Sequence, residues 1–451
     1  MKEKTMKRLT LPLLMLLLLV NAPLAAAAVE LEMVVEGLTA PIELADPDDG
    51  SGRLFVVEQQ GLVSMLTKDG QVSETPLLDL RPHLLELKND FEERGLLGFA
   101  LHPDFKSNGR VYVSYATPLR DTAPKGWNYT RRISELTLAP DAESIDLGTE
   151  RPLIELDWPS RKHNGGGLAF GPDGFLYIGL GDGGGAHGVG EEVIWSAFDV
   201  PKDQLHWDRL AQDTTSLFGS ILRIDVDGGF PGYGISDDNP FVGRPGRDEI
   251  YAYGFRNPYR IAFDKNGSGD LLATAIAETL WEAIYLIDGP GNYGWPLMEG
   301  TRCVNRAAPR KPPADCPRHG PDGTPIRQPI VEYPNMQVMH PDTSLEALGV
   351  DATGVGTAVV GGRIYRGSAL PELRGKLVFA DWSAAFERPS GQLFLATPPE
   401  RWRDLWSFEK LKELDTRIIS VAEDAEAELY ILTNDEFGPF GKTGKIFKLA
   451  P

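Results

Sequence analysis

The chain has 451 residues, of which 42% are hydrophobic and 24% are charged, a composition typical of a globular protein that buries a sizeable core. Its formal net charge is −20 at neutral pH, which argues against nucleic acids and anionic membranes as partners. The 49 glycines and 35 prolines favour a fold of many short strands joined by many turns.

The N-terminal segment has the pattern of a signal peptide. Four basic residues among the first eight precede an apolar run over 9–20, and alanines at 25–28 offer an Ala-x-Ala cleavage site. A membrane-spanning helix needs about 20 apolar residues, so cleavage of residues 1–28 is preferred to an anchor. Cleavage removes four basic residues and one acidic residue, and the net charge becomes −23. We therefore expect a periplasmic or secreted protein that is not inserted in a membrane after cleavage.

A loose unit, a Gly- or Asp-bearing turn followed by a short apolar strand, recurs six times along the chain. The strand segments begin at Arg53, Arg110, Phe175, Asp270, Lys376 and Glu428. Six four-stranded blades need roughly 420 residues, and no linker divides the chain. We predict an all-β fold, a single six-bladed β-propeller over residues 29–451 with long inserted loops on one face; a pair of β-sandwiches is the alternative. Short helices are expected only in the loops 80–93 and 190–213.

The chain contains two cysteines, Cys303 and Cys316, in a polar stretch rich in proline. In an exported protein, a pair that closes a short loop is typical of a disulfide. A two-cysteine metal site is the weaker interpretation, because neither Cys-x-x-Cys spacing nor a cluster of histidines accompanies the pair.

The candidate for acid–base chemistry is His163, which opens the run His-Asn-Gly-Gly-Gly just before a Pro-Asp-Gly turn and a strand-like apolar segment. A histidine in such a loop can reach a pocket at the end of a sheet and accept a proton near neutral pH. A packed structural histidine is the alternative for this residue on its own.

Several arginines lie next to glycine or Asn-Pro, among them Arg94, Arg256 and Arg366. A guanidinium offers a fixed fork of donors, which suits a flat ligand that carries carboxylates. For each arginine taken alone, a salt bridge at the surface or between blades is the alternative.

Taken in order, five motifs resemble those of the glucose/sorbosone dehydrogenase family of quinoprotein six-bladed propellers, which includes soluble aldose sugar dehydrogenases and hedgehog-interacting-like proteins. The motifs are Glu93-Arg-Gly-Leu-Leu-Gly, His163-Asn-Gly-Gly, Gly171-Pro-Asp-Gly, Gly254-Phe-Arg-Asn-Pro and Asn292-Tyr-Gly-Trp-Pro. The resemblance covers residues from about 38 to 449, which is nearly the whole mature chain.

The resemblance implies oxidation of a sugar's anomeric hydroxyl to a lactone by pyrroloquinoline quinone, a non-covalent tricarboxylate held with Ca²⁺, and a separate electron acceptor. It makes His163 the base that takes the hydroxyl proton, and Arg256 the group that polarises the reacting carbonyl. Asn164 and Asn257 are expected to contact the cofactor, and Arg366 to neutralise its carboxylates.

Two segments depart from the family pattern. Glu93 and Arg94, also expected to bind the cofactor, stand where the family often has a glutamine. The calcium loop 275–283 has lost its glycine, although Ala277 and Glu278 keep the main-chain carbonyls expected to bind the metal, and Glu278 adds a carboxylate. The alternative function is therefore a non-catalytic ligand- or protein-binding propeller that has lost the redox site.

Overall fold

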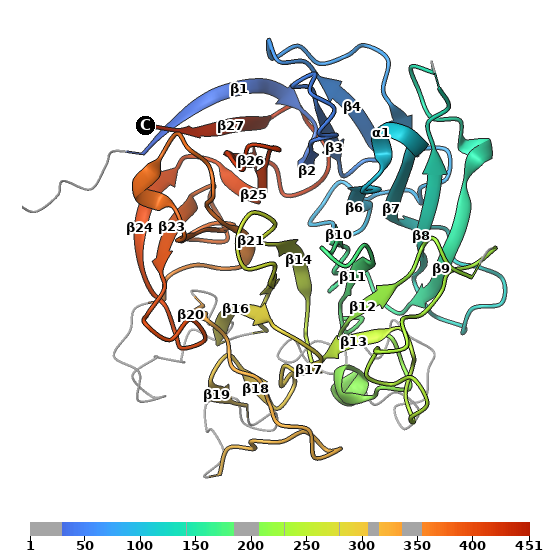
Figure 1. Ribbon diagram of the computed structural model, residues 1–451, viewed down its shortest axis with the longest axis vertical. Helices are drawn as coiled ribbons and strands as arrows, with labels where there is room; N and C mark the ends of the chain where they lie inside the picture. Colours follow the sequence, from blue (N-terminus) through green and yellow to red (C-terminus); the bar gives the residue numbers. More distant parts are fainter. Residues whose placement is uncertain are drawn as a thin grey trace, which may run out of the picture.

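The computed structural model describes residues 29–140, 142–184, 207–229, 231–278, 280–304, 315–335 and 354–451. It shows the predicted six-bladed β-propeller, with six sheets arranged around a central axis (Figure 1). The predicted signal peptide and most of the predicted helical loop 190–213 lie outside the described residues.

The first three blades follow one another in the sequence. The first blade comprises β2 (Pro41–Ala45), β3 (Leu54–Glu58), β4 (Leu62–Leu66) and β5 (Leu78–Asp79). The second comprises β6 (Leu96–Leu101), β7 (Arg110–Thr117), β8 (Tyr129–Thr137) and β9 (Arg151–Trp158). The third comprises β10 (Leu168–Phe170), β11 (Leu176–Leu180), β12 (Ser220–Ile224) and β13 (Ile250–Tyr253), with the short parallel strand β17 (Gly291–Asn292) at its edge.

The last three blades complete the ring. The fourth blade comprises β14 (Pro258–Phe263), β15 (Leu271–Ala275), β16 (Trp281–Ile287) and β20 (Val331–Pro334). The fifth comprises β21 (Val359–Ile364), β22 (Leu377–Asp381), β23 (Gly391–Thr397) and β24 (Ser407–Leu414). The sixth comprises β25 (Arg417–Glu423), β26 (Leu429–Asn434), β27 (Gly444–Ala450) and β1 (Glu30–Leu38). Because β1 pairs antiparallel with β27, the two ends of the propeller meet in one sheet and close the ring.

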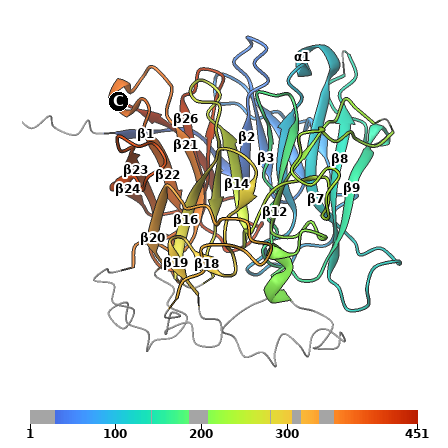
Figure 2. The same cartoon turned by 60° about the horizontal axis from the view of Figure 1, so that its bottom comes forward.

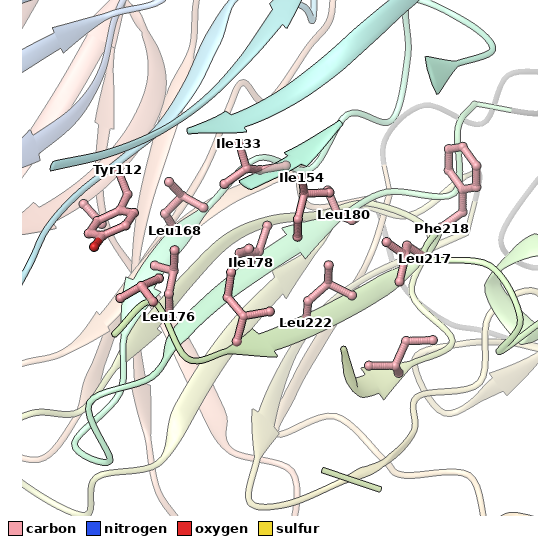
Figure 3. Close-up of a cluster of buried hydrophobic side chains, with 14 of the residues drawn as sticks. Tyr112, Ile133, Ile154, Leu168, Leu176, Ile178, Leu180, Leu217, Phe218 and Leu222 are labelled. Atoms are coloured by element: carbon pink, nitrogen blue, oxygen red, sulfur yellow. The ribbon is translucent and has the colours of Figure 1, made fainter. Parts of the chain in front are cut away.

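Each of the six strand segments found in the sequence is the second strand of its blade: β3, β7, β11, β15, β22 and β26. These strands are buried almost throughout, because a blade packs on each of their faces, and continuous burial gives the apolar runs that the sequence shows. Figure 3 shows one such packing layer, in which Leu176, Ile178 and Leu180 of β11 contact side chains of the neighbouring strands.

The helix expected over 80–93 is wrong, because the structure has turns and irregular backbone there. Leu80 is fully buried against the first two blades, and the carboxylate of Glu92 accepts hydrogen bonds from the backbone N–H groups of Lys88 (3.1 Å) and Arg94 (3.1 Å). These contacts fix a non-helical path. The described helices are short: α1 (Phe105–Asn108), η1 (Leu147–Thr149), η2 (Trp207–Gln212) and η4 (Pro371–Leu373). Within the described residues no helix is long and apolar enough to cross a membrane.

A buried arginine ties several blades together near the central axis. Arg260 of β14 donates to the carbonyl oxygens of Leu97 (2.7 Å) and Ile42 (2.7 Å) and to the hydroxyl of Ser420 (3.3 Å). These partners belong to the second, first and sixth blades. Arg260 therefore positions the inner strands around the axis.

The hairpin of β18 (Met298–Glu299) and β19 (Arg302–Cys303) projects at the end of the propeller opposite α1 (Figure 2). Cys303, which pairs with Met298 at the open end of this hairpin, forms a disulfide with Cys316, with 5.3 Å between the two Cα atoms. The link fastens the base of an inserted segment to the scaffold.

Candidate functional site

A cavity of about 380 Å³ lies where the inner strands begin, and residues from all six blades line it. Its polar lining includes Gln59, Glu93, Lys162, His163, Asn164, Arg256, Asn257, Glu278, Asn335, Thr357, Asn434 and Glu436. A volume of this size is typical of a small-molecule site.

The loop between β9 and β10 brings His163 into this cavity. His163 adopts a positive φ of 52°, and Gly165 follows with 59°. A Cβ atom on Gly165 would lie 2.7 Å from the carbonyl oxygen of Gly179, so this close approach to β11 requires glycine. Because β10 and β11 are antiparallel, the residues before β10 lie beside those after β11, and His163 meets Asp182.

Asp182 fixes the orientation of the histidine ring. Its Oδ1 lies 2.7 Å from Nδ1 of His163 and 3.0 Å from the backbone nitrogen of Gly184, while its Oδ2 accepts from Nε1 of Trp295 at 2.9 Å. Burial alone would raise the pKa of Asp182, but its contacts with His163 and the charge of Arg256 hold that pKa below the ordinary value. The carboxylate is therefore ionised and accepts a hydrogen bond from Nδ1–H of the ring.

Arg256 lies on the other side of the ring. One of its terminal nitrogens donates to Nε2 of His163 at 2.5 Å, and its Nε donates to the carboxylate of Glu278 at 2.6 Å. Since Arg256 has donors only, Nε2 must be an acceptor, and the hydrogen-bond partners assign the single ring proton to Nδ1. In this arrangement Nδ1 of His163 donates to Asp182, and Nε2 is the acceptor beside Arg256.

Three other residues expected to bind a cofactor lie at the same place and support the histidine loop. Glu93 accepts the backbone N–H of His163 at 2.7 Å, and Asn257 accepts that of Gly165 at 2.7 Å through its Oδ1. The side-chain amide of Asn164 donates to a backbone carbonyl of its own loop at 2.8 Å. The structure brings Glu93, His163, Asn164, Arg256 and Asn257 together.

Two predicted residues do not reach the cavity. Arg94 is buried in a two-pronged ion pair with Glu92 (2.8 and 2.5 Å), and Arg366 forms a similar pair with Asp264 (2.8 and 2.6 Å). Arg366 follows β21, a six-residue strand whose first residues begin at the cavity, so it lies roughly 20 Å further along the axis. Arg366 therefore closes blades four and five at the opposite end of the propeller rather than meeting a ligand in the cavity.

The loop expected to hold calcium is fixed by buried acids. The carboxylate of Glu282 lies 3.3 Å from the backbone nitrogen of Ala277, and that of Glu299 lies 3.0 Å from the nitrogen of Glu278. Burial raises the pKa of Glu282 to about 8, although its hydrogen bonds oppose this shift. In the described part of the chain, no three His, Cys, Asp or Glu side chains are grouped so that they could hold a metal ion. Calcium at Ala277 and Glu278 stays a prediction.

The outer wall of the cavity is aromatic. Phe91, Trp382, Phe386 and Phe437 form what we call the aromatic platform, with ring centroids 5.3–6.3 Å apart in the contacting pairs. These residues come from three loops that are distant in the sequence.

Asp182, Trp295 and the platform were not among the site residues expected from the sequence. Asp182 had a usable signal, because it directly follows β11 in Gly-Leu-Gly-Asp and an antiparallel partner places it beside His163. Trp295 lies within a recognised motif, but only the fold shows that its indole reaches Asp182. The platform had no signal in any single segment.

A family model described as Glucose / Sorbosone dehydrogenase matches residues 38–315, which is more than half of the chain. The chain belongs to this family. It is similar to the human Hedgehog-interacting protein, with 30% identity over 436 residues that cover 93% of this chain and 52% of that protein.

It is also similar to quinoprotein glucose dehydrogenase B of Acinetobacter calcoaceticus, with 33% identity over 219 residues, 48% of this chain and 42% of that protein. The chain spans about half the length of these curated relatives. Among solved structures, the pyrroloquinoline quinone-bound aldose sugar dehydrogenase of Streptomyces coelicolor superposes with a TM-score of 0.64 at 22% identity, covering 95% of this chain and 99% of that one. At that identity the likeness supports the fold.

Proposed function

We propose that the central cavity binds a sugar and that His163 accepts the proton of one of its hydroxyl groups, which is the proton-transfer half of sugar dehydrogenation. The observation that carries the proposal is the pair of His163 and Asp182 in the cavity lining, in which Asp182 holds Nδ1 and leaves Nε2 as the acceptor beside Arg256. Membership of the glucose/sorbosone dehydrogenase family supports a sugar as the ligand.

The geometry supports the following sequence of events. A sugar hydroxyl takes the place of Arg256 at Nε2 of His163, and the ring accepts its proton. Asp182 then stabilises the imidazolium through Nδ1–H, as an ionised carboxylate does for a general-base histidine. Arg256, adjacent to the same nitrogen, stabilises negative charge that develops on the ligand oxygen.

The finer expectation is oxidation of the anomeric hydroxyl to a lactone by pyrroloquinoline quinone. Arg256 and Asn257 would suit the quinone carbonyls of this cofactor, but its three carboxylates need cations. The charged side chains that line the cavity are Lys162, Arg256, Glu92, Glu93, Glu278 and Glu436. Arg256 is paired with Glu278, and Glu92 is paired with Arg94. Arg366 is bound to Asp264 at the opposite end of the propeller. Among the described lining residues, this leaves one cation, Lys162, and two carboxylates, those of Glu93 and Glu436, outside these pairs. The residues present do not fit a tricarboxylate, and we assign no hydride step to it.

This charge balance favours a second candidate function, a propeller that binds a ligand or a protein without redox chemistry. The similarity to the human Hedgehog-interacting protein, whose name describes binding, supports this candidate. For either function, the N-terminal pattern of residues 1–28 supports export to the periplasm or the exterior.

One experiment separates the two candidates. The mature chain is mixed with pyrroloquinoline quinone and Ca²⁺, and a panel of aldoses is offered with a dye as electron acceptor. Turnover that is lost in the His163→Asn variant supports a dehydrogenase. Such turnover would also mean that the protein neutralises the three carboxylates of the cofactor by groups other than those described above. Saturable sugar binding without turnover supports the binding function. Absence of both turnover and sugar binding overturns the proposal.

A further inference from the structure

The aromatic platform is an unusual surface for this chain. The large hydrophobic side chains exposed among the described residues are Met33, Phe91, Leu405 and Phe437, so two of the four lie on the platform. Phe91 and Phe437 are each 38% exposed. Exposed aromatic faces at the mouth of a cavity mark a binding surface when they are held in place.

A buried arginine holds these rings. The guanidinium of Arg417 lies 4.9 Å from the ring centroid of Trp382 and 4.1 Å from that of Phe437. It also donates to the carbonyl oxygens of Phe386 (3.3 Å) and Asp435, which belong to the two loops that carry three of the rings. Arg417 itself is only 2% exposed. The platform is therefore preorganised, because one rigid fork fixes both loops from behind.

Beside the platform, the cavity lining is rich in carboxylates and amides, and its two cations are Lys162 and Arg256, the latter paired with Glu278. Gln59, Glu93, Asn434 and Glu436 line the same cavity. Carboxylates and amide oxygens accept hydrogen bonds from the hydroxyl groups of a neutral ligand, whereas the carboxylates repel an anion. The amide nitrogens of Gln59 and Asn434 already donate to backbone carbonyl groups of the protein.

We infer that the aromatic platform is a stacking subsite for the apolar face of a neutral pyranose ring, and that this cavity selects uncharged cyclic sugars over acyclic polyols and sugar acids. A pyranose presents C–H groups on one face, which pack on aromatic rings, and hydroxyl groups at its edge, which reach the acceptors. The inference rests on the proposed function, since it identifies the class of sugar that the same cavity takes.

Ligand binding tests this inference without any turnover. Methyl β-glucopyranoside has a pyranose ring but no free anomeric hydroxyl to oxidise. Its dissociation constant for the mature chain, measured by calorimetry or saturation-transfer NMR, is compared with those of glucitol and glucuronate. We expect the dissociation constant of the glucoside to be at least about tenfold lower than that of either glucitol or glucuronate. A tenfold difference corresponds to about 1.4 kcal/mol of binding free energy. Equal affinity for glucitol overturns stacking, and equal affinity for glucuronate overturns the charge selection.

Phe437→Leu removes one exposed ring of the platform, and Phe175→Leu is its matched control. Phe175 also packs against an arginine, since the guanidinium carbon of Arg223 lies 5.4 Å from its ring centroid, and it does not line the cavity. We expect Phe437→Leu to weaken glucoside binding at least about fivefold and Phe175→Leu to leave it unchanged, with thermal melting showing that both variants fold. Unchanged binding in Phe437→Leu refutes the subsite. The two proposals can fail separately. If the glucoside binds and Phe437→Leu weakens that binding, but no aldose is oxidised, the enzymatic part of the proposed function is refuted while the stacking subsite is supported.

Discussion

Replacement of Asp182 by Asn tests whether the carboxylate sets the chemistry of His163. Asp182 uses its two oxygens to accept from His163, Gly184 and Trp295. An asparagine has one acceptor oxygen and one NH₂ group. If the oxygen faces His163, the NH₂ group opposes the indole N–H of Trp295; if the amide is turned round, the NH₂ group donates to Nδ1, and the ring proton moves to Nε2 against Arg256.

Either arrangement sets two donors against each other, which costs about 1–3 kcal/mol for a buried group. The arrangement that relieves Trp295 also removes the base, since Nε2 then carries the proton. We expect a mixed or inverted ring tautomer in Asp182→Asn, and a loss of about 10²–10⁴ in any turnover that uses His163. Nitrogen NMR of the histidine ring reports the tautomer directly and does not depend on activity.

Trp295→Phe provides the matched background. Without the indole N–H, the asparagine oxygen can face His163 without setting two donors against each other, so Asp182→Asn combined with Trp295→Phe is expected to recover the Nδ1–H tautomer. A double-mutant cycle then measures the coupling between positions 182 and 295. If the single variant Asp182→Asn already keeps the Nδ1–H tautomer, the reasoning about the pair is refuted.

Three further predictions concern stability. Reduction of the Cys303–Cys316 disulfide, which spans 13 residues, should lower the free energy of unfolding by about 3 kcal/mol in chemical denaturation, and an unchanged midpoint would contradict this. Burial raises the pKa of Glu282 to about 8 and that of Asp381 to about 7, so the folded state binds more protons than the unfolded chain above about pH 4.5. Thermal stability from this pair should therefore fall as pH rises from about 5 to 8, and Glu282→Gln with Asp381→Asn should flatten that slope; a slope equal to that of the unsubstituted chain counts against it. Arg260→Met should cost about 3–5 kcal/mol in urea unfolding, because it leaves buried carbonyl groups of two blades without donors, and a cost below 1 kcal/mol would show that water or repacking replaces them.

The fold was predictable because one strand per blade is buried on both faces. The segments beginning at Arg110 and Phe175, for example, became β7 and β11, whose apolar runs are continuous. The outer strands have weaker sequence patterns. In β24, for example, half of the residues are exposed and charged residues interrupt the apolar ones, so its sequence cannot be distinguished from that of a loop. Of the short helices, η2 lies within the predicted loop 190–213, whereas α1, η1 and η4 were not predicted, since a turn such as α1 depends on its packing against the blade.

The candidate site was predictable where residues precede the first strand of a blade. His163 precedes β10, and Arg256 and Asn257 precede β14, so all three lie at the same end of the propeller. Arg366 instead follows the C-terminal end of β21, the first strand of its blade, and this position in the sequence already places it at the end of the propeller opposite the cavity. Arg94 could not be excluded in this way, because it precedes β6; only the structure shows that Glu92 takes both prongs of its guanidinium.

Glu278 decides how much chemistry Arg256 can perform. Both Nε and a terminal nitrogen of Arg256 contact its carboxylate, so the positive charge beside His163 is already balanced in the folded chain. A ligand oxygen that gains negative charge must compete with Glu278 for the guanidinium, and buried pairs of this kind are costly to separate. The loop 275–283, which departs from the family pattern in sequence, thereby restricts the same site in structure. Glu278→Gln should release Arg256 toward the ligand: we expect affinity for an anionic sugar such as glucuronate to rise in this variant while that for methyl β-glucopyranoside changes little. Titration calorimetry with both sugars checks this, and an unchanged glucuronate affinity would show that Glu278 does not control the charge of the cavity.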